Sequence, residues 1–224
     1  MRNSLSEYKT LVFDCDGVIL NSNKIKTEAF YRVALAYGEP AAQELVRYHV
    51  ENGGVSRYKK FKYFLDEIVP NLTNNKVSGR NLEALLGNYA KIVLDGLLSC
   101  ELAEGLEELR KKIPEANWLI VSGGDQTELN EVFSKRKLSH LFDGGIYGSP
   151  DTKDEILSRE IGSGNIILPA LFLGDSKYDY QAATTANLDF VFLSDWSEVN
   201  SWEEWCQINQ IAYYSSLKQV PRSH

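Results

Sequence analysis

Residues 11–18 read Leu-Val-Phe-Asp-Cys-Asp-Gly-Val, and this stretch decides how the rest of the sequence is interpreted. Its β-branched and aromatic run predicts a strand over Thr10–Phe13 that leads into a turn. Residues two apart on a strand point to the same face, so we expect Asp14 and Asp16 to project together. Gly17 permits the sharp backbone turn that follows them.

Two neighbouring carboxyl groups at the end of a buried strand are suited to acid–base and nucleophilic chemistry. Both cannot ionise cheaply, so their pKa values should split. One can then remain a carboxylate nucleophile while the other holds a proton for a leaving group. The alternative is an ordinary Asp-Gly turn in which the aspartates cap backbone amides. The apolar run before Asp14 weakens that alternative, because buried strand ends rarely take two acids without a function.

Further apolar runs predict the remaining strands of a parallel sheet. They occupy Asn117–Val121, Ala170–Leu173, Asp189–Leu193 and, as a shorter candidate, Gly145–Gly148. Helical patterns alternate with these runs, at Leu102–Ile113, Leu129–Leu141, Asp151–Ile161 and Lys177–Ala186. The alternation predicts an α/β fold with a doubly wound, Rossmann-like parallel sheet.

The long segment between the first and second strands has a different character. It contains no convincing strand, and four amphipathic helices are predicted in it, at Lys24–Tyr37, Ala41–Asn52, Arg57–Val69 and Asn81–Leu94. We therefore expect an all-helical cap domain at 21–99, inserted after the first strand. The α/β core domain would be discontinuous, comprising 1–20 and 100–224, with the apolar tail from Asn200 packed against it.

The composition narrows the partners that the protein could have. The 224 residues carry a formal net charge of −7, which disfavours nucleic acid as a partner. No apolar run approaches the roughly 20 residues that a membrane-spanning helix needs, and no secretory signal is visible. The cysteines are odd in number and lack paired spacing, which argues against disulfides or a zinc site and favours a cytoplasmic location: Cys15, Cys100 and Cys206.

A second group of acids follows the apolar run Ala170–Leu173. Gly174-Asp175-Ser176 forms the expected turn, and Asp179 lies one helical turn later. A carboxylate there could face Asp14 across neighbouring strand ends, and Mg²⁺ prefers such oxygen ligands. The alternative is simple capping of the following helix by Asp175 or Ser176.

Two other positions could bind an anion. Ser122 and Gly123 follow a predicted strand, where a hydroxyl and free amides form a phosphate cradle. Lys153 lies at the start of a predicted helix and could bring a positive charge to a phosphoryl oxygen. Taken singly, a Gly-rich turn and a solvated lysine would be the favoured explanations of these residues.

In their order along the chain, these motifs resemble the haloacid dehalogenase superfamily. The resemblance runs from about Tyr8 to Leu193 and rests on Asp-x-Asp-Gly-Val, a later Ser, a Lys and Gly-Asp-x-x-x-Asp. The helical insert looks like the cap of the phosphoglycolate phosphatase and β-phosphoglucomutase-like branch. Two positions depart from the common pattern: Lys153 is followed by Asp154 rather than proline, and Asn21 stands where many relatives have Asp.

The resemblance implies a role for each motif residue. Asp14 would attack phosphorus and form an aspartyl-phosphate, and Asp16 would protonate the leaving oxygen and later activate water. Ser122, Gly123 and Lys153 would bind the transferring phosphoryl group. Mg²⁺ would be held by the side chains of Asp14 and Asp175 and by the backbone carbonyl of Asp16, and Asp179 would lie close by.

The dehalogenases of the superfamily lack the second acid of the first motif, so Asp16 indicates phosphate esters. The resemblance thus implies a magnesium-dependent phosphatase acting on a small phosphomonoester such as a sugar phosphate. In the predicted cap, residues 53–57 are similar to a substrate-facing Gly-Val-Ser-Arg turn, which makes Arg57 a candidate substrate ligand. The alternative for Arg57 is a turn before an exposed basic helix.

Two other functions stay open at this point. One is a phosphosugar mutase, in which the aspartyl-phosphate returns its phosphoryl group to the sugar; Arg57 supports it. The other is a signalling module that stores a phosphoryl group on Asp14, against which the helical insert and Asp16 both argue. The sequence does not decide between a monomer and a homodimer.

Overall fold

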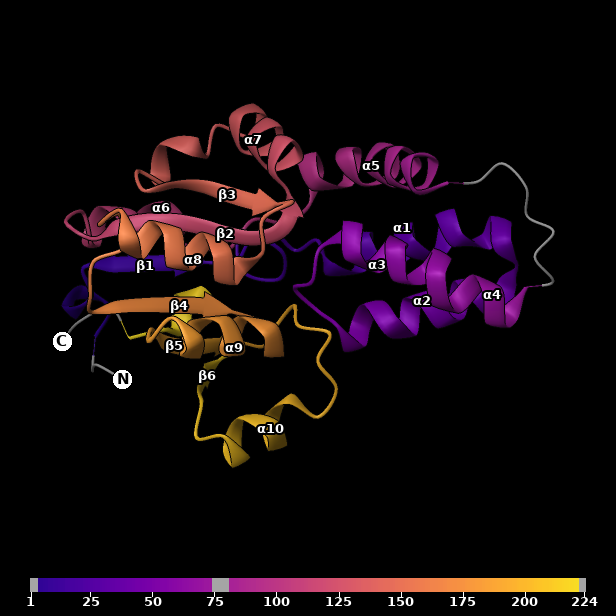
Figure 1. The fold of residues 1–224 in the computed structure, drawn as a ribbon. Helices are drawn as coiled ribbons and strands as arrows, with labels where there is room; N and C mark the ends of the chain where they lie inside the picture. Colours follow the sequence, from indigo (N-terminus) through magenta and orange to yellow (C-terminus); the bar gives the residue numbers. More distant parts are fainter. Residues whose placement is uncertain (1–3, 74–80, 222–224) are drawn as a thin grey trace.

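The computed structural model describes residues 4–73 and 81–221, so both ends of the predicted core and residues 74–80 of the predicted cap lie outside it. Within it, six strands form one parallel sheet in the order β3-β2-β1-β4-β5-β6 (Figure 1). The strands are β1 (Thr10–Phe13), β2 (Asn117–Asp125), β3 (Gly145–Ser149), β4 (Ala170–Gly174), β5 (Asp189–Leu193) and β6 (Ala212–Tyr214). The predicted doubly wound parallel sheet is confirmed.

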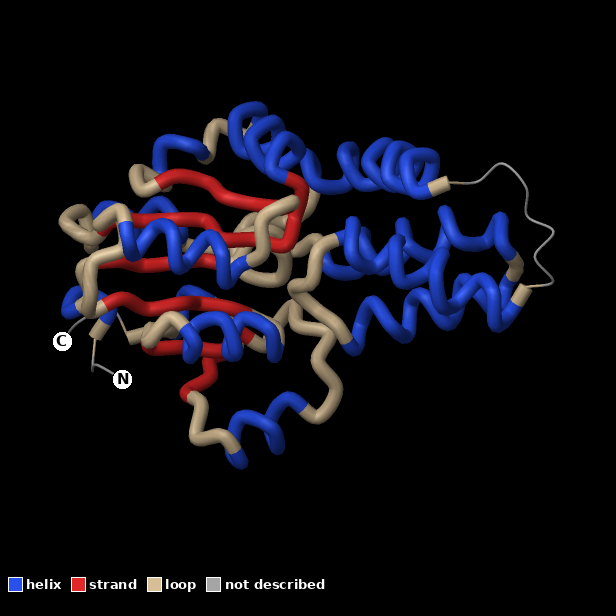
Figure 2. Tube along the Cα trace, in the orientation of Figure 1, coloured by secondary structure: helices blue, strands red, loops and turns tan. Residues whose placement is uncertain are grey.

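Alternation along the strands divides the apolar side chains between two layers of helices. On β1, Leu11 and Phe13 enter one hydrophobic cluster and Val12 enters the other. The first cluster includes side chains of α6 (Leu106–Lys112) and α7 (Gln126–Lys135). The second includes side chains of α8 (Lys153–Gly162), α9 (Lys177–Thr185) and α10 (Trp202–Ile208). The sheet therefore lies between helical layers, as Figure 2 shows.

The chain between β1 and β2 is helical wherever it has regular structure in the described residues. It forms α1 (Asn23–Ala34), α2 (Glu39–Glu51), α3 (Arg57–Tyr63), a π-helical segment (Phe64–Ile68), α4 (Val69–Leu72) and α5 (Leu82–Ser99). These helices extend away from the sheet on the side to which the strand arrows point, whereas both chain ends lie at the opposite side (Figure 1). They consequently stand over the carboxyl ends of the strands, where open α/β sheets bind ligands.

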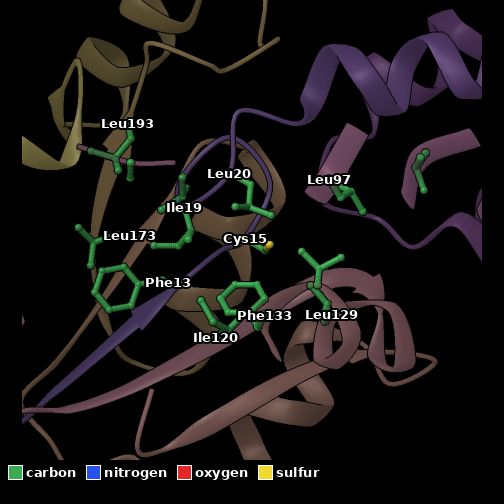
Figure 3. Close-up of a cluster of buried hydrophobic side chains, with 14 of the residues drawn as sticks. Phe13, Cys15, Ile19, Leu20, Leu97, Ile120, Leu129, Phe133, Leu173 and Leu193 are labelled. Carbon is green, nitrogen blue, oxygen red and sulfur yellow. The ribbon is translucent and has the colours of Figure 1, made fainter. Parts of the chain in front are cut away.

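The first hydrophobic cluster runs without interruption from the sheet to these helices. Phe13 and Ile120 of the sheet, Cys15 of the loop after β1, and Leu97 of α5 belong to it (Figure 3). Further along the insert, Phe30 packs against Tyr89 with ring centroids 4.5 Å apart. The inserted helices thus share one core with the sheet. No helix of the described residues is long and apolar enough to span a membrane.

Several elements differ from the sequence-based expectation. The predicted helix Arg57–Val69 is divided by the π-helical segment, which directly precedes the turn containing Pro70; proline cannot donate the helical hydrogen bond. The helix predicted over Leu129–Leu141 ends at Lys135, because Lys137 takes a left-handed conformation with φ of 58°. The tail adds a sixth strand, β6, that was not expected.

Candidate active site

The candidate site lies at the carboxyl ends of β1 and β4, the two central strands. Asp14 follows β1, and Asp175 follows β4. Gly17 closes the loop after β1 with φ of +77°, and a Cβ atom built there would lie 2.1 Å from Asp175 Oδ2. Glycine is therefore required for the two loops to approach each other.

Three carboxylates meet at this place. Asp14, Asp175 and Asp179 each offer an oxygen such that all three atoms lie within 4.8 Å of one another, and all three residues are buried. Asp14 Oδ1 also accepts a hydrogen bond of 2.7 Å from the Cys15 amide. Oxygen donors so arranged are suited to a hard divalent cation such as Mg²⁺.

Lys153 supplies positive charge beneath the carboxylates. It is the first residue of α8, whose start is fixed by a capping box between Thr152 and Glu155. Its Nζ lies 3.0 Å from Asp14 Oδ1 and forms a second ion pair with Asp179. With 1% of its surface exposed, Lys153 is a component of the site rather than a solvated surface lysine.

Asp179 holds the loop after β4 in place. Its Oδ2 accepts hydrogen bonds from the amide of Asp175 (3.2 Å) and from the amide and hydroxyl of Ser176 (3.0 and 2.7 Å). Ser176 is also the N-cap of α9, so the helix-capping alternative is correct for Ser176. The oxygens of Asp179 are thus engaged by Lys153 and this loop, which favours a supporting place beside a cation over direct ligation.

The clustering of carboxylates affects their protonation. Burial, with smaller contributions from Asp179 and Asp16, raises the pKa of Asp14 to about 7 although Lys153 opposes the shift. Burial and the proximity of Asp14 raise the pKa of Asp175 well above its usual value. A divalent cation would relieve both effects by favouring the ionised forms. The chemistry of these donors therefore fits a metal ion.

Asp16 faces a different set of partners. Lys26 of α1 lies 2.5 Å from Asp16 Oδ2, and the Ser22 hydroxyl donates to Oδ1 at 2.6 Å. Burial opposes ionisation, but the charge and hydrogen bond of Lys26 bring the pKa of Asp16 below its usual value. The pKa values of Asp14 and Asp16 split as expected, but the raised one belongs to Asp14, because Lys26 compensates Asp16.

The loop after the apolar part of β2 brings Gly123 into the site. Gly123 and Gly124 line the same cavity as Asp14, and a Cβ atom at Gly123 would lie 2.1 Å from the carbonyl oxygen of Gly54. The buried Ser122 lies beside them, and its hydroxyl accepts a hydrogen bond of 3.0 Å from the Gly124 amide. The turn around Gly54 thus rests directly on the glycine-rich loop of the sheet.

The inserted helices close the cavity from the other side. It has a volume of about 60 Å³, and basic residue types of the insert line it: Lys26, His49, Arg57 and Lys60. A cavity of this size holds only a few water molecules.

Arg57 is brought to this cavity but is already engaged. Its guanidinium forms a bidentate ion pair with Glu128 of α7, with Nη1 2.8 Å from Oε2, and lies 4.6 Å from the centre of the Tyr89 ring. Both members of the ion pair are buried. The predicted exposed basic helix is therefore not what the structure shows for Arg57, and its role as a substrate ligand stays a prediction.

Some residues of the site were not singled out from the sequence. Asn23 donates to Asp175 Oδ2 at 2.7 Å and to the Trp196 carbonyl at 2.8 Å, which joins α1 to the loops after β4 and β5. Lys26, His49 and Glu128 were also missed. Each lies on an amphipathic helix at a position where a polar side chain is ordinarily solvated, so the sequence holds no clear signal for them.

A protein-family profile covers most of the chain. The profile of the haloacid dehalogenase-like hydrolases matches residues 11–193. Among curated proteins, no sequence matches significantly.

Solved structures share the fold at low identity. A predicted phosphatase from Clostridium acetobutylicum has a TM-score of 0.67 at 16% identity and covers 95% of each chain. A β-phosphoglucomutase from Clostridium difficile has a TM-score of 0.66 at 18% identity, covering 94% of this chain and 92% of its own. CbbY from Rhodobacter sphaeroides, in complex with phosphate, has a TM-score of 0.64 at 14% identity, covering 87% and 90%. The chain belongs to the haloacid dehalogenase-like hydrolase family.

Proposed function

We propose that the protein is a magnesium-dependent phosphatase that hydrolyses a small organic phosphomonoester through an aspartyl-phosphate on Asp14. The observation that carries this proposal is the position of the Asp14 carboxylate. It lies against Lys153 and among the oxygens of Asp175 and Asp179, and it lines a cavity that it shares with Asp16. A nucleophile, a second acid and concentrated positive charge are what phosphoryl transfer requires.

In the proposed reaction, an Asp14 oxygen forms a bond to phosphorus while the bond from phosphorus to the ester oxygen breaks. Asp16 would donate a proton to that leaving oxygen, for which it must leave its ion pair with Lys26 and become protonated once the substrate is bound. In the second step Asp16 accepts a proton from water, which attacks phosphorus and releases the Asp14 carboxylate and inorganic phosphate. Lys153, Ser122 and the Gly123 amide would hold the phosphoryl oxygens.

Magnesium would be held mainly by Asp14 and Asp175. Asp14 Oδ2 and Asp175 Oδ1 accept no hydrogen bond from the described residues, whereas the oxygens of Asp179 are engaged. The ion would neutralise negative charge on the phosphoryl group. Asp179 would support it from behind, and the backbone carbonyl of Asp16 completes the proposed protein ligands.

We also propose that 21–99 act as a cap domain over a core made of 1–20 and 100–224. The connections between the two parts run side by side, because the Asn21 amide donates to the Glu101 carbonyl at 3.0 Å and Leu20 pairs with Leu102. A hinge there would let the helices open for the substrate and close to exclude water.

A phosphosugar mutase is the second candidate. The cavity that the cap closes is small and lined by cations, and the exclusion of water favours return of a phosphoryl group over hydrolysis. Measuring isomerisation of hexose 1-phosphates beside phosphate release separates the two activities. Release without isomerisation supports the phosphatase.

Phosphate release from a panel of small phosphomonoesters tests the proposal. The wild-type protein should release phosphate only when Mg²⁺ is added, and Asp14→Asn should lower kcat by about 10³-fold or more because the nucleophile is lost. Asp95→Asn, on the exposed face of α5, is the matched control and should keep the wild-type rate. An Asp14→Asn protein that turns over normally would rule the mechanism out.

A further inference from the structure

Lys60 differs from the other buried cations of the site in having no anionic partner. Among the described residues, Lys26 is paired with Asp16, Arg57 with Glu128, and Lys153 with Asp14 and Asp179. Lys60 has only 2% of its surface exposed and lines the same cavity, yet no carboxylate of the described chain lies within ion-pair distance of it. A buried ammonium without a counter-charge is costly unless a ligand supplies one.

A chain of hydrogen bonds links Lys60 to Glu198 through His49 and Thr27, and it fixes which nitrogen of His49 is the acceptor. The Thr27 hydroxyl donates to Glu198 Oε2 at 2.7 Å, so its oxygen accepts from His49 Nε2 at 3.1 Å. His49 Nδ1 must then be the acceptor of the 2.7 Å contact with Lys60 Nζ. His49 is thereby fixed as a neutral imidazole; burial and the nearby Lys60 and Lys26 charges place its pKa well below the usual value.

This chain of hydrogen bonds leaves one N–H group of Lys60 without an acceptor among the described residues. An ammonium has three N–H groups, and the described residues accept from two of them at most, through His49 Nδ1 and the His49 carbonyl at 3.3 Å. Glu198 does not compensate the charge directly, because Thr27 and His49 stand between them. Lys60 Nζ also lies 5.6 Å from the centre of the Phe30 ring, which supplies no counter-charge, and Lys60 lines the cavity that also contains Asp14.

We propose that Lys60 binds a second anionic group of the substrate, held in place by His49. This inference rests on the proposed function and narrows its substrate class to phosphomonoesters that carry a carboxylate or a second phosphate a short distance from the ester. Arg57 is not available for that purpose while Glu128 neutralises it. The transferring phosphoryl group lies at Asp14 and Lys153, and the second anion lies on the cap side of the same cavity.

A length-matched series of esters tests the assignment. Propyl phosphate has a neutral tail, 3-phosphonooxypropanoate has a carboxylate and propane-1,3-diyl bisphosphate has a phosphate. The wild-type protein should show a higher kcat/KM for at least one anionic tail than for propyl phosphate, and the better of the two identifies the anion. Lys60→Met should reduce that ratio about 10-fold or more, as expected for a lost hydrogen bond to a charged group.

Lys59→Met is the matched control, because Lys59 is exposed on the same helix, and it should keep the wild-type ratio. Lys60→Arg should keep part of the preference because it retains the charge. A wild-type ratio near one, or an unchanged ratio in Lys60→Met, would overturn the inference while leaving the phosphatase proposal intact.

Binding of non-hydrolysable phosphonates separates the two proposals. By calorimetry, 3-phosphonopropanoate should bind the wild-type protein more tightly than propylphosphonate, and Lys60→Met should abolish the difference. If none of the esters is hydrolysed but this difference is seen, the anion site stands and the phosphatase proposal fails. Equal binding of the two phosphonates would rule out a carboxylate as the anion at Lys60, and together with an ester ratio near one for the phosphate tail it would overturn the anion site.

Discussion

Lys60 also has a consequence for stability that can be measured without a substrate. Burial and the Lys26 charge lower its pKa to about 7, whereas a lysine of the unfolded chain titrates near 10.4. Between these values the unfolded state binds more protons than the folded state, so this group makes the free energy of unfolding rise with pH from about 7 to 10. Below pH 7 both states are protonated, and the contribution is constant.

We therefore expect the free energy of unfolding of the wild-type protein to rise, relative to that of Lys60→Met, as the pH increases from 7 to 9.5. Urea unfolding at a series of pH values measures it. Lys59→Met should run parallel to the wild type over the same range, since Lys59 is exposed. Parallel curves for the wild type and Lys60→Met would show that Lys60 is not a perturbed lysine.

At the residue scale, the sequence predicts side chains that follow strands better than those that face a cavity from helices. Asp14 and Asp175 could be placed near each other because parallel strands end at one edge of the sheet. Lys26 and His49 could not, because their surroundings depend on how the helices between β1 and β2 pack on the sheet. Because Lys26 was not predicted as the partner of Asp16, the direction of the Asp16 pKa shift was not predicted either.

At the scale of elements, α3 and α7 are joined by polar contacts between the insert and the sheet domain. Arg57 pairs with Glu128, and the Tyr58 hydroxyl donates to Asp125 Oδ2 at 2.5 Å. Asp125 is also the N-cap of α7, where its Oδ1 accepts from the Glu128 amide at 2.9 Å. The start of α7 thus provides both carboxylates that hold α3 in the closed arrangement.

Glu128→Gln should loosen this contact, because it leaves the buried Arg57 without its counter-charge. Removing one partner of a buried ion pair costs on the order of 3 kcal/mol, which favours an arrangement in which Arg57 reaches water. Small-angle scattering should show a larger radius of gyration than for the wild type. Glu131→Gln, one turn later on α7, is the control and should leave the radius unchanged, because Glu131 pairs with the exposed Lys135 of its own helix and not with α3. A compact Glu128→Gln protein would mean that apolar packing and the Tyr58–Asp125 hydrogen bond close the insert without the ion pair.

The elements that the sequence predicts poorly are those whose limits depend on distant contacts. β1 and β5 were predicted to the residue because their apolar runs are continuous and bounded by polar residues. β6 has only three residues and exists because Ala212–Tyr214 pairs with β5. The start of α6 at Leu106 follows Gly105 in a left-handed conformation, while Leu102 pairs with Leu20 instead of joining the helix.

For the whole molecule, the carboxylate cluster couples the free energy of folding to metal binding. The protein has a net charge of −7, and it buries Asp14, Asp175 and Asp179 together, with Lys153 as the cation that pairs with Asp14 and Asp179 in the described residues. Carboxylates must be ionised to bind a metal, and burial opposes ionisation until a cation is present. Stability should therefore depend on Mg²⁺ and on pH together.

A ligand that binds only the folded state at 100 times its Kd adds about 2.7 kcal/mol, which for a chain of this size raises Tm by about 5–10 °C. We expect such an increase with Mg²⁺ at pH 8 in thermal unfolding. The increase should be smaller at pH 5.5, because the pKa of Asp14 lies at about 7 and protons then compete with the metal. Asp175→Asn should lose most of the increase, and the exposed Asp195→Asn should keep it. Equal increases in both variants would place the metal elsewhere, because Asp175 contributes the ligand oxygen that its loop holds beside Asp14.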